Sequence, residues 1–310
     1  MMMTLMLALA LVQEATLPQE LLRSGISRRE AGDSEGALLT FSTILSTVAD
    51  PAVREAAHFE RAATYYKIGA YWEAYHDFEA FILRFPQSPR VTDAKRLEMT
   101  SALNLARVGK STFMGLMTSD KAGIDALNDA LRRYPREDFS PDFTQKLGMF
   151  HYDREDYDLA AEVFTRVLDL YGDSSDAVLA LYMLGRTAEV RFDSIDKDIK
   201  PLRDARRHYE RFLEEAERMR RLPDPARRNV DGLIRVVQER LTTVYERMLA
   251  KQLMTAEYYD WKGLPRSSRL YYEAILKEEA SFRRILPAFP DTEGTKKARE
   301  RLAEMKSLPK

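Results

Sequence analysis

Apolar positions recur every three to four residues along most of this chain, and glycine, proline or short polar stretches divide the pattern into paired segments. The clearest pair covers residues 53–89. There, an apolar helical pattern runs as far as Lys67, Gly69 interrupts it, and a second pattern runs from Trp72 to Phe85 before Pro86. No stretch alternates convincingly every two residues, so the pattern predicts helices and no strands.

Small and aromatic residues within this pair follow a regular spacing. Ala62 and Ala74 would let two helices approach closely, while Tyr65, Tyr71 and Phe78 would fill the angle between them. The order of small residue, Tyr, Gly at the turn, Ala, Phe and closing Pro matches a tetratricopeptide hairpin. One such hairpin cannot bury both of its faces, so it predicts neighbouring copies along the chain.

Further copies can be placed on both sides of this hairpin. Ala37 and Phe41 precede Ala74 and Phe78 by 37 residues, which is the period of about 34 residues lengthened by a short connection. The sequence therefore predicts an all-α tetratricopeptide-repeat superhelix of about six helical hairpins, with a charged C-terminal capping helix over residues 292–305. The other copies cover residues 17–51, 90–134, 138–172, 176–213 and 229–286.

The repeats suggest a division of the chain into an N-terminal and a C-terminal part. We expect about four hairpins in residues 17–175, and further repeats with the capping helix in residues 176–310. The short apolar run over residues 1–15 predicts a signal peptide, and the alternative is the apolar start of a first helix. This run is too short to span a bilayer, so we expect no transmembrane segment.

Composition narrows the class of protein. With 48 basic and 49 acidic residues the formal net charge is −1, which provides no strong positive field for binding nucleic acid. Hydrophobic residues make up 45% and charged residues 31%, as in a folded soluble protein. The absence of cysteine removes disulfides, thiolate metal sites, cysteine nucleophiles and a lipid anchor through Cys.

Candidate catalytic and ligand-binding motifs fail on their spacing. Residues 108–112 end like a phosphate-binding loop, but Asn104 stands where that motif needs Gly, and a predicted helix precedes it. The four histidines lie in four predicted helices, and no pair has the i, i+4 spacing of a helical metal site. Asp193, Asp196 and Asp198 lack the Gly and Glu of a calcium loop. We therefore expect no enzyme activity, no cofactor and no metal.

The first helix of each hairpin should line the concave face of a superhelix, with side chains at its second, fifth, ninth, twelfth and thirteenth places. In the second hairpin these include Phe59, Tyr66 and Lys67, and neighbouring hairpins add Arg29 and Arg96. Aromatic rings surrounded by cations suit a peptide with aromatic residues and a terminal carboxylate. Interhelical packing is an equally good interpretation of Phe59. We expect Tyr66 to be exposed because Tyr65 already takes the packing position.

Three segments carry a family resemblance: R-F-P-x-S-P at residues 84–89, D-x-x-x-x-x-L-R-D-A-R-x-x-Y-x-x-F-L at 196–213, and A-E-Y-Y-D-W-K-G at 256–263. In their order and spacing over nearly the whole chain, these segments resemble the BamD family. Members of that family are tetratricopeptide lipoproteins of the outer-membrane β-barrel assembly machinery, so the resemblance implies a non-catalytic periplasmic scaffold associated with the outer membrane.

The same resemblance implies partners for each part of the chain. The amino-terminal repeats would receive unfolded outer-membrane proteins, and the carboxy-terminal repeats would dock a BamA-like partner through Arg203, Arg206 and the Tyr258, Tyr259 and Trp261 cluster. The family is anchored by a lipid on Cys, which this sequence lacks, so we expect no such anchor. The alternative is a free tetratricopeptide adaptor, periplasmic or cytoplasmic, that binds another peptide in envelope or cell-division control.

Overall fold

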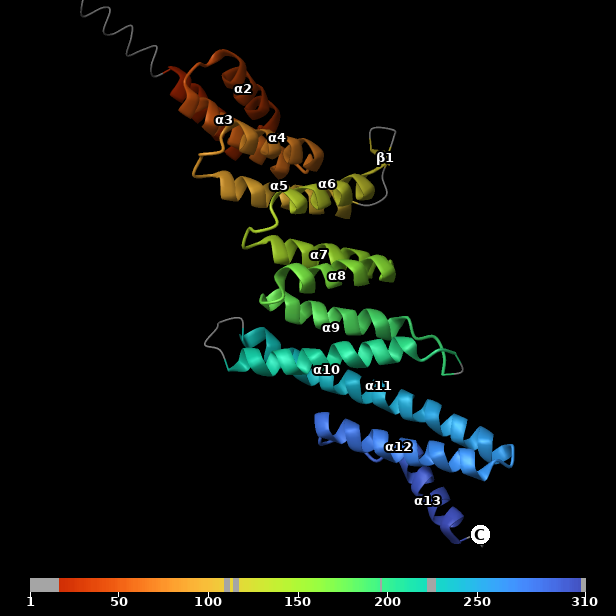
Figure 1. The fold of residues 1–310 in the computed structure, drawn as a ribbon. Coiled ribbons are helices and arrows are strands. Elements are labelled where there is room, and N and C mark those ends of the chain that lie inside the picture. The colour runs from red at the N-terminus through yellow and green to blue at the C-terminus, as the bar shows by residue number, and fades with distance from the viewer. Residues whose placement is uncertain (1–16, 109–111, 114–116, 196, 222–226, 308–310) are drawn as a thin grey trace, which may run out of the picture. The chain divides into compact units, whose positions relative to one another are not determined.

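The computed structural model describes residues 17–108, 112–113, 117–195, 197–221 and 227–307. Helices occupy most of these residues and follow one another as hairpins in chain order (Figure 1). The described residues form six helical hairpins and a closing helix, which confirms the predicted all-α tetratricopeptide-repeat fold. The predicted signal peptide, residues 1–15, lies outside the described residues.

The hairpins have the boundaries that the apolar pattern predicts to within a few residues, except that the second helix of the fifth hairpin continues to Arg220, beyond the predicted end at residue 213. The first hairpin joins a helix over residues 17–30 to α2 (Ser34–Thr47). The next five are α3 (Pro51–Lys67) with α4 (Tyr71–Arg84), α5 (Val91–Arg107) with α6 (Ser119–Arg133), α7 (Ser140–Asp153) with α8 (Tyr157–Tyr171), α9 (Ser175–Val190) with α10 (Lys200–Arg220), and α11 (Arg227–Trp261) with α12 (Pro265–Ile285). The closing helix is α13 (Glu293–Ser307).

A short strand ladder in the α5–α6 connection corrects the expectation of no strands. β1 (Thr112–Phe113) and β2 (Met117–Thr118) pair antiparallel, with Thr112 opposite Thr118. Strands of two residues are too short to show an alternating pattern in the sequence. Periodicity therefore could not have detected them.

Local signals explain where the hairpin of α3 and α4 begins and turns. The Asp50 carboxylate accepts a hydrogen bond of 2.9 Å from the backbone N–H of Ala52, which caps α3. Pro51 then occupies the first turn of the helix, where its missing N–H costs nothing. After α3, Gly69 adopts a φ of +80°, a left-handed conformation that glycine reaches without strain, and the chain reverses into α4.

Small residues allow the two helices of a hairpin to approach closely, as predicted. A Cβ atom at Gly148 in α7 would lie 2.5 Å from a ring carbon of Phe164 in α8. The same atom at Gly185 in α9 would lie 2.3 Å from a ring carbon of Tyr209 in α10. Each aromatic ring thus occupies the space that a larger residue on the first helix would need.

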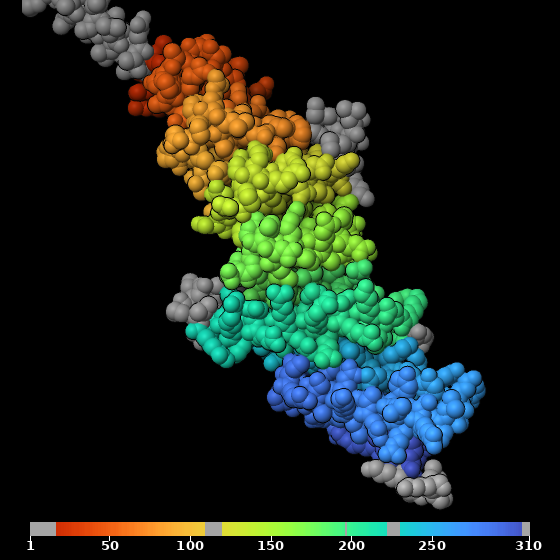
Figure 2. Space-filling model, viewed as in Figure 1, coloured from red at the N-terminus to blue at the C-terminus, as the bar shows by residue number. Residues whose placement is uncertain are grey.

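The chain divides into two compact units, and the division falls within α7. We call residues up to Phe143 the N-terminal unit and residues from Thr144 the C-terminal unit. The repeat boundary expected at residues 175 and 176 stays a prediction. Within each unit the hairpins pack closely against their neighbours along the chain (Figure 2).

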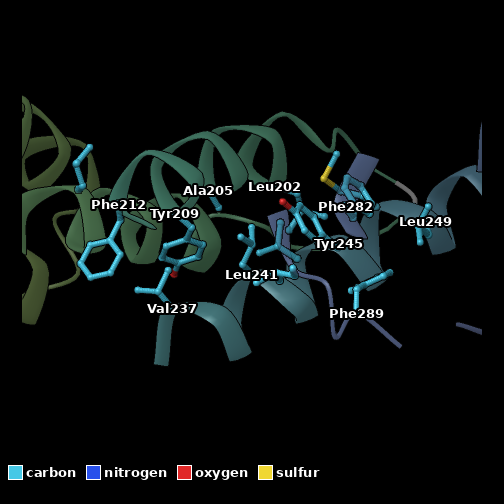
Figure 3. Close-up of a cluster of buried hydrophobic side chains, with 14 of the residues drawn as sticks. Leu202, Ala205, Tyr209, Phe212, Val237, Leu241, Tyr245, Leu249, Phe282 and Phe289 are labelled. Atoms are coloured by element: carbon cyan, nitrogen blue, oxygen red, sulfur yellow. The ribbon is translucent and has the colours of Figure 1, made fainter. Parts of the chain in front are cut away.

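Each unit has its own apolar core. In the N-terminal unit, one cluster lies around Phe41 in the first hairpin, and another lies around Phe78 and Phe81 among α3, α4 and α5. In the C-terminal unit, the rings of Tyr245 in α11 and Phe282 in α12 stack with their centroids 3.7 Å apart (Figure 3). None of the described helices is both long and apolar enough to cross a membrane.

Candidate protein-binding surfaces

A nearly buried carboxylate joins the first helices of the first three hairpins. Arg29, near the end of the helix over residues 17–30, forms an ion pair with Glu60 of α3. Arg90, just before α5, contacts the other oxygen of this carboxylate at 3.2 Å. The Glu60 side chain is only 12% exposed, and two guanidinium groups converge on it. Lys67 Nζ also donates a hydrogen bond of 3.1 Å to the carbonyl oxygen of Arg29.

Phe59 lies under this ion-pair network and contributes to interhelical packing. Its ring meets those of Phe78 and Phe81 edge-on, at centroid distances of 5.7 and 5.5 Å. The Arg90 guanidinium carbon lies 4.8 Å from the Phe59 ring centroid. The half-buried ring therefore connects the core of the hairpin to the cationic residues on its surface.

The remaining residues of the predicted groove lie on the same helices. Tyr66 was expected to be exposed, but it is half-buried, because it packs against the hairpin core together with Tyr65. Its hydroxyl accepts a hydrogen bond of 3.3 Å from Asn104 Nδ2 in α5. Lys67 is exposed. Arg96 is exposed too, but its guanidinium lies 4.8 Å from the ring centroid of Phe139, in a separate contact. The structure thus connects Arg29, Phe59 and Lys67, places Tyr66 beside them, and leaves Arg96 apart. Peptide binding by this set stays a prediction.

Sequence reasoning missed Glu60 and Arg90. Glu60 takes the sixth place of its helix, which is not one of the places expected to face the groove, and Arg90 lies in a connection. Their ion pair spans 30 residues of sequence. No local spacing predicts such a contact, because it depends on how neighbouring hairpins stack.

One of the two histidines in this hairpin, His58, is buried in a polar network. His58 Nε2 lies 3.2 Å from Asp77 Oδ1, and Arg61 Nε donates to the other carboxylate oxygen at 2.8 Å. Burial alone would raise the pKa of Asp77, but hydrogen bonds from His58 and Arg61 outweigh it and hold that pKa below its usual value. The three side chains join α3 to α4.

Exposed aromatic residues gather at the turn between α11 and α12. The side chains of Trp261 and Tyr258 are 77% and 51% exposed, and their ring centroids lie 6.2 Å apart. Lys262 Nζ lies 5.3 Å from the Trp261 ring and 5.6 Å from the Tyr258 ring. Tyr259 stacks on Tyr271 at 5.2 Å. We call these five residues the turn cluster.

The acidic residue in this turn, Asp260, is paired within the protein. Asp260 accepts hydrogen bonds of 2.9 Å from the Tyr272 hydroxyl and from Arg301 of α13. Burial would raise the pKa of Asp260, yet the hydrogen bonds from Ser268, Tyr272 and Arg301 lower it below its usual value. Because Arg301 neutralises this carboxylate, Lys262 supplies the exposed charge of the turn cluster.

The two arginines predicted to dock a partner differ from each other. Arg203 is exposed on α10. The Arg206 guanidinium is half-buried, 4.9 Å from the ring centroid of Phe282 and 5.6 Å from that of Tyr245. Its ion-pair partners are Glu210 at 2.7 Å and Glu278 at 3.5 Å.

The predicted docking set does not gather in one place. Tyr258 follows Tyr245 by 13 residues along α11, which is roughly 20 Å of helix. The aromatic members of the predicted docking set therefore gather, whereas Arg206 packs elsewhere.

Known structures provide several comparisons of low identity. A crystal structure of MamA is 20% identical, with a TM-score of 0.39 over 68% of this chain and 97% of that chain. A tetratricopeptide repeat protein from Parabacteroides merdae is 12% identical, with a TM-score of 0.38 over 92% of this chain and 97% of that one. TTC0263, a tetratricopeptide protein from Thermus thermophilus, is 18% identical, with a TM-score of 0.32 over 71% and 98%. No curated protein matches the chain.

A protein-family model provides the decisive comparison. The model described as YfiO, outer membrane lipoprotein, matches residues 115–278, which is more than half of the chain. The matched residues include α7 to α10, the whole of α11 and the turn cluster. The match confirms the resemblance to the BamD family: this chain belongs to the YfiO, or BamD-like, family of outer membrane lipoproteins.

Proposed function

We propose that this protein is a non-catalytic protein-binding scaffold in the assembly of outer-membrane β-barrel proteins. The observation that carries the proposal is the turn cluster, an exposed group of aromatic rings that lies within the residues matched by the family model. Exposed tryptophan and tyrosine beside a cation are typical of the residues that dominate binding energy in protein interfaces.

The turn cluster would dock a partner of the BamA kind in the C-terminal unit. The Trp261 side chain is 77% exposed, so a partner could bury most of its large apolar surface. Lys262 lies over both Trp261 and Tyr258, and would bring a positive charge into the same interface. Arg203 remains in the proposed docking set because it is exposed, whereas Arg206 is half-buried against Phe282 and Tyr245.

The N-terminal unit would receive unfolded segments of outer-membrane proteins. Arg29, Lys67 and Arg96 place cations along the first helices, and Phe59 and Tyr66 place partly exposed rings beside them. Cations beside aromatic rings suit an extended segment with aromatic residues and a terminal carboxylate. Membership of an outer membrane lipoprotein family supports a place in the cell envelope, on the periplasmic side of that membrane.

Affinity capture tests the proposal directly. The tagged full-length chain is incubated with detergent-solubilised envelopes of its own organism, and the captured proteins are identified by mass spectrometry. We expect a barrel-bearing outer-membrane protein with the wild type, and its loss with the double variant Tyr258→Ser and Trp261→Ser. Leu39→Ser is the matched control, because Leu39 is an equally apolar side chain, 69% exposed, on α2 of the other unit.

Two results would contradict the proposal. If the wild type captures no barrel protein, the assembly function is wrong and a free adaptor that binds another peptide is favoured. If the double variant captures the barrel protein as well as the control does, docking does not use the turn cluster. Circular dichroism of both variants establishes that they remain folded.

A further inference from the structure

A half-buried arginine in the C-terminal unit lacks an acidic partner. In α9, Arg186 Nη1 donates a hydrogen bond of 3.1 Å to the Tyr182 hydroxyl, and Nη2 donates one of 3.2 Å to the Tyr152 hydroxyl of α7. Its Nε atom is buried and has no hydrogen-bond partner. Within the part of the chain that the structure describes, no carboxylate forms an ion pair with Arg186.

The repeat register places these three side chains on the first-helix face of their hairpins. Counting from Gly185 as the eighth place of its helix, Tyr182 and Arg186 take the fifth and ninth places. Tyr152 takes the twelfth place when Gly148 is the eighth. These are the places at which Phe59, Ala63 and Tyr66 lie in the second hairpin. The group therefore lies on the face that the repeat fold offers to a ligand.

The hydrogen-bonding capacity of this group is that of an anion site. Each tyrosine hydroxyl already accepts a bond from Arg186, so its own O–H remains to be donated. Arg186 keeps one further N–H on each terminal nitrogen, and its Nε–H is buried. The unused N–H and O–H groups are donors beside a positive charge, so a ligand with acceptor atoms and a negative charge matches them. A carboxylate meets both requirements and fits a guanidinium with two parallel hydrogen bonds.

The nearest acidic residue on the same helix is already neutralised. Glu189 follows Arg186 by three positions and accepts a hydrogen bond of 2.9 Å from the Tyr209 hydroxyl. Arg240 and Arg247 of α11 lie 3.1 and 3.9 Å from its two carboxylate oxygens. Tyr209 is buried between α10 and α11, where Figure 3 shows it beside Val237. Because two other arginines already pair with Glu189, this carboxylate does not form an ion pair with Arg186 in the described residues.

Aromatic rings border the site and would favour an anion that also carries an apolar part. The rings of Tyr152 and Tyr157 meet edge-on at 5.5 Å, and the ring of Tyr182 lies 6.5 Å from that of Tyr209. An aspartate or glutamate side chain would cover such a border with its methylene groups while its carboxylate reaches Arg186. Inorganic phosphate has no apolar part with which to do so.

We infer that Tyr152, Tyr182 and Arg186 bind the carboxylate of an acidic side chain in a bound protein segment. The inference rests on the proposed function only in taking the ligand to be a protein. It adds to that function a second recognition point, in the C-terminal unit, distinct from both the N-terminal groove residues and the turn cluster. A segment with an aspartate or glutamate at the matching distance would be preferred over its amide counterpart.

Nuclear magnetic resonance of the full-length chain tests the site without a partner protein. The Nε–H resonance of Arg186 is assigned by its loss in Arg186→Lys. The probes are N-acetylglutamic acid α-amide, whose side chain carries its only carboxylate, and N-acetylglutaminamide, both at constant ionic strength. We expect a saturable shift of the Arg186 resonance with the glutamate probe and none with the glutamine probe. Equal responses, or no saturation with either, would overturn the inference.

Two further measurements separate the contribution of the tyrosine hydroxyls from simple attraction to a positive charge. The double variant Tyr152→Phe and Tyr182→Phe keeps both rings and removes both hydroxyls, and should bind the glutamate probe about tenfold more weakly. Unchanged affinity would show that the hydroxyls are not part of a site.

The Nε–H resonance of Arg235, an exposed residue on α11, is the reference, and its shift should not saturate with the glutamate probe. Tighter binding of inorganic phosphate than of the glutamate probe would also overturn the assignment. None of these results depends on envelope capture, so failure here is distinguishable from failure of the proposed function.

Discussion

Arg133 and Glu98 form an ion pair in which the carboxylate side chain is fully buried and the guanidinium is 30% exposed. The same guanidinium donates a hydrogen bond of 2.8 Å to the Tyr75 hydroxyl and lies 3.0 Å from Glu79. Tyr75 and Glu79 belong to α4, Glu98 to α5 and Arg133 to α6. One arginine thus connects three helices of the N-terminal unit around a charge that water cannot reach.

Arg133→Met should destabilise the protein because it leaves Glu98 buried without a counter-charge. Breaking a buried pair in this way costs about 3 kcal/mol of unfolding free energy. Urea denaturation followed by circular dichroism measures the loss. Arg132→Met is the matched control, since Arg132 is 75% exposed and pairs only with Asp129 on the surface, so its loss should stay below about 0.5 kcal/mol. Equal losses in the two variants would show that the buried pair has no special role.

The stability of the protein should fall as the pH rises towards neutrality because of Glu98. Burial raises the pKa of Glu98 from 4.5 to about 7, although Arg133 opposes the shift. Between these two values the folded state holds a proton that the unfolded state releases, so the free energy of unfolding decreases with increasing pH. Below that window both states are protonated, and above it both are ionised.

Glu98→Gln isolates this effect, because the amide does not titrate. The free energy of unfolding of the wild type minus that of Glu98→Gln should decrease by up to about 3 kcal/mol between pH 4.5 and 7. Urea denaturation at several pH values provides the difference. A difference that stays constant across this range would mean that Glu98 titrates normally in the folded state.

Gly185→Ala should destabilise the C-terminal unit. The added Cβ atom would lie 2.3 Å from the ring of Tyr209, which is fully buried and has little space in which to move. Overpacking of this kind costs about 1–3 kcal/mol. In Gly232→Ala the new Cβ meets nothing within 4 Å, and replacing an exposed helical glycine should stabilise α11 by about 0.5–1 kcal/mol. Thermal unfolding of both variants should therefore shift in opposite directions, and shifts of the same sign would contradict the prediction.

Tyr66→Ala and Lys67→Glu should weaken peptide binding without unfolding the protein. Lys67 is exposed, and Tyr66 loses only its ring contacts and one hydrogen bond to Asn104, worth about 1 kcal/mol. Fluorescence anisotropy with a labelled peptide from the last strand of an outer-membrane barrel protein should show about tenfold weaker binding. Ala74→Trp should instead unfold a repeat, because Ala74 is fully buried. Equal loss of helicity in all three variants would show that the groove assignment is wrong.

The positions of the hairpins could be predicted because their signals are local. Gly69 at a turn, Pro51 in a first turn, and pairs such as Ala74 and Phe78 each act within a few residues of sequence. The close packing of Gly185 on Tyr209 follows from the same repeat spacing. A two-residue ladder such as Thr112–Phe113 with Met117–Thr118 leaves no periodic signal, so it could not be predicted.

The candidate sites were only partly predictable. The turn cluster was found because Tyr258, Tyr259 and Trp261 are adjacent in sequence, and neighbours at a helix end stay together in space. Tyr182 and Arg186 carry a usable signal, since the register that marks Tyr66 also marks their places. Arg206 was expected on a docking surface, and the structure instead places it against the rings of Phe282 and Tyr245.

By itself the sequence determined the repeat, its register and the residues at which each helix begins and turns, because these depend on backbone preferences and contacts between close neighbours. Only the tertiary structure decided which charges are satisfied. Glu60 pairs with Arg29 and Arg90, each about 30 residues away along the chain, whereas Arg186 contacts two hydroxyls and pairs with no carboxylate in the described residues. Charge pairing depends on distances of a few ångströms between stacked hairpins, and these distances are set when the hairpins pack together.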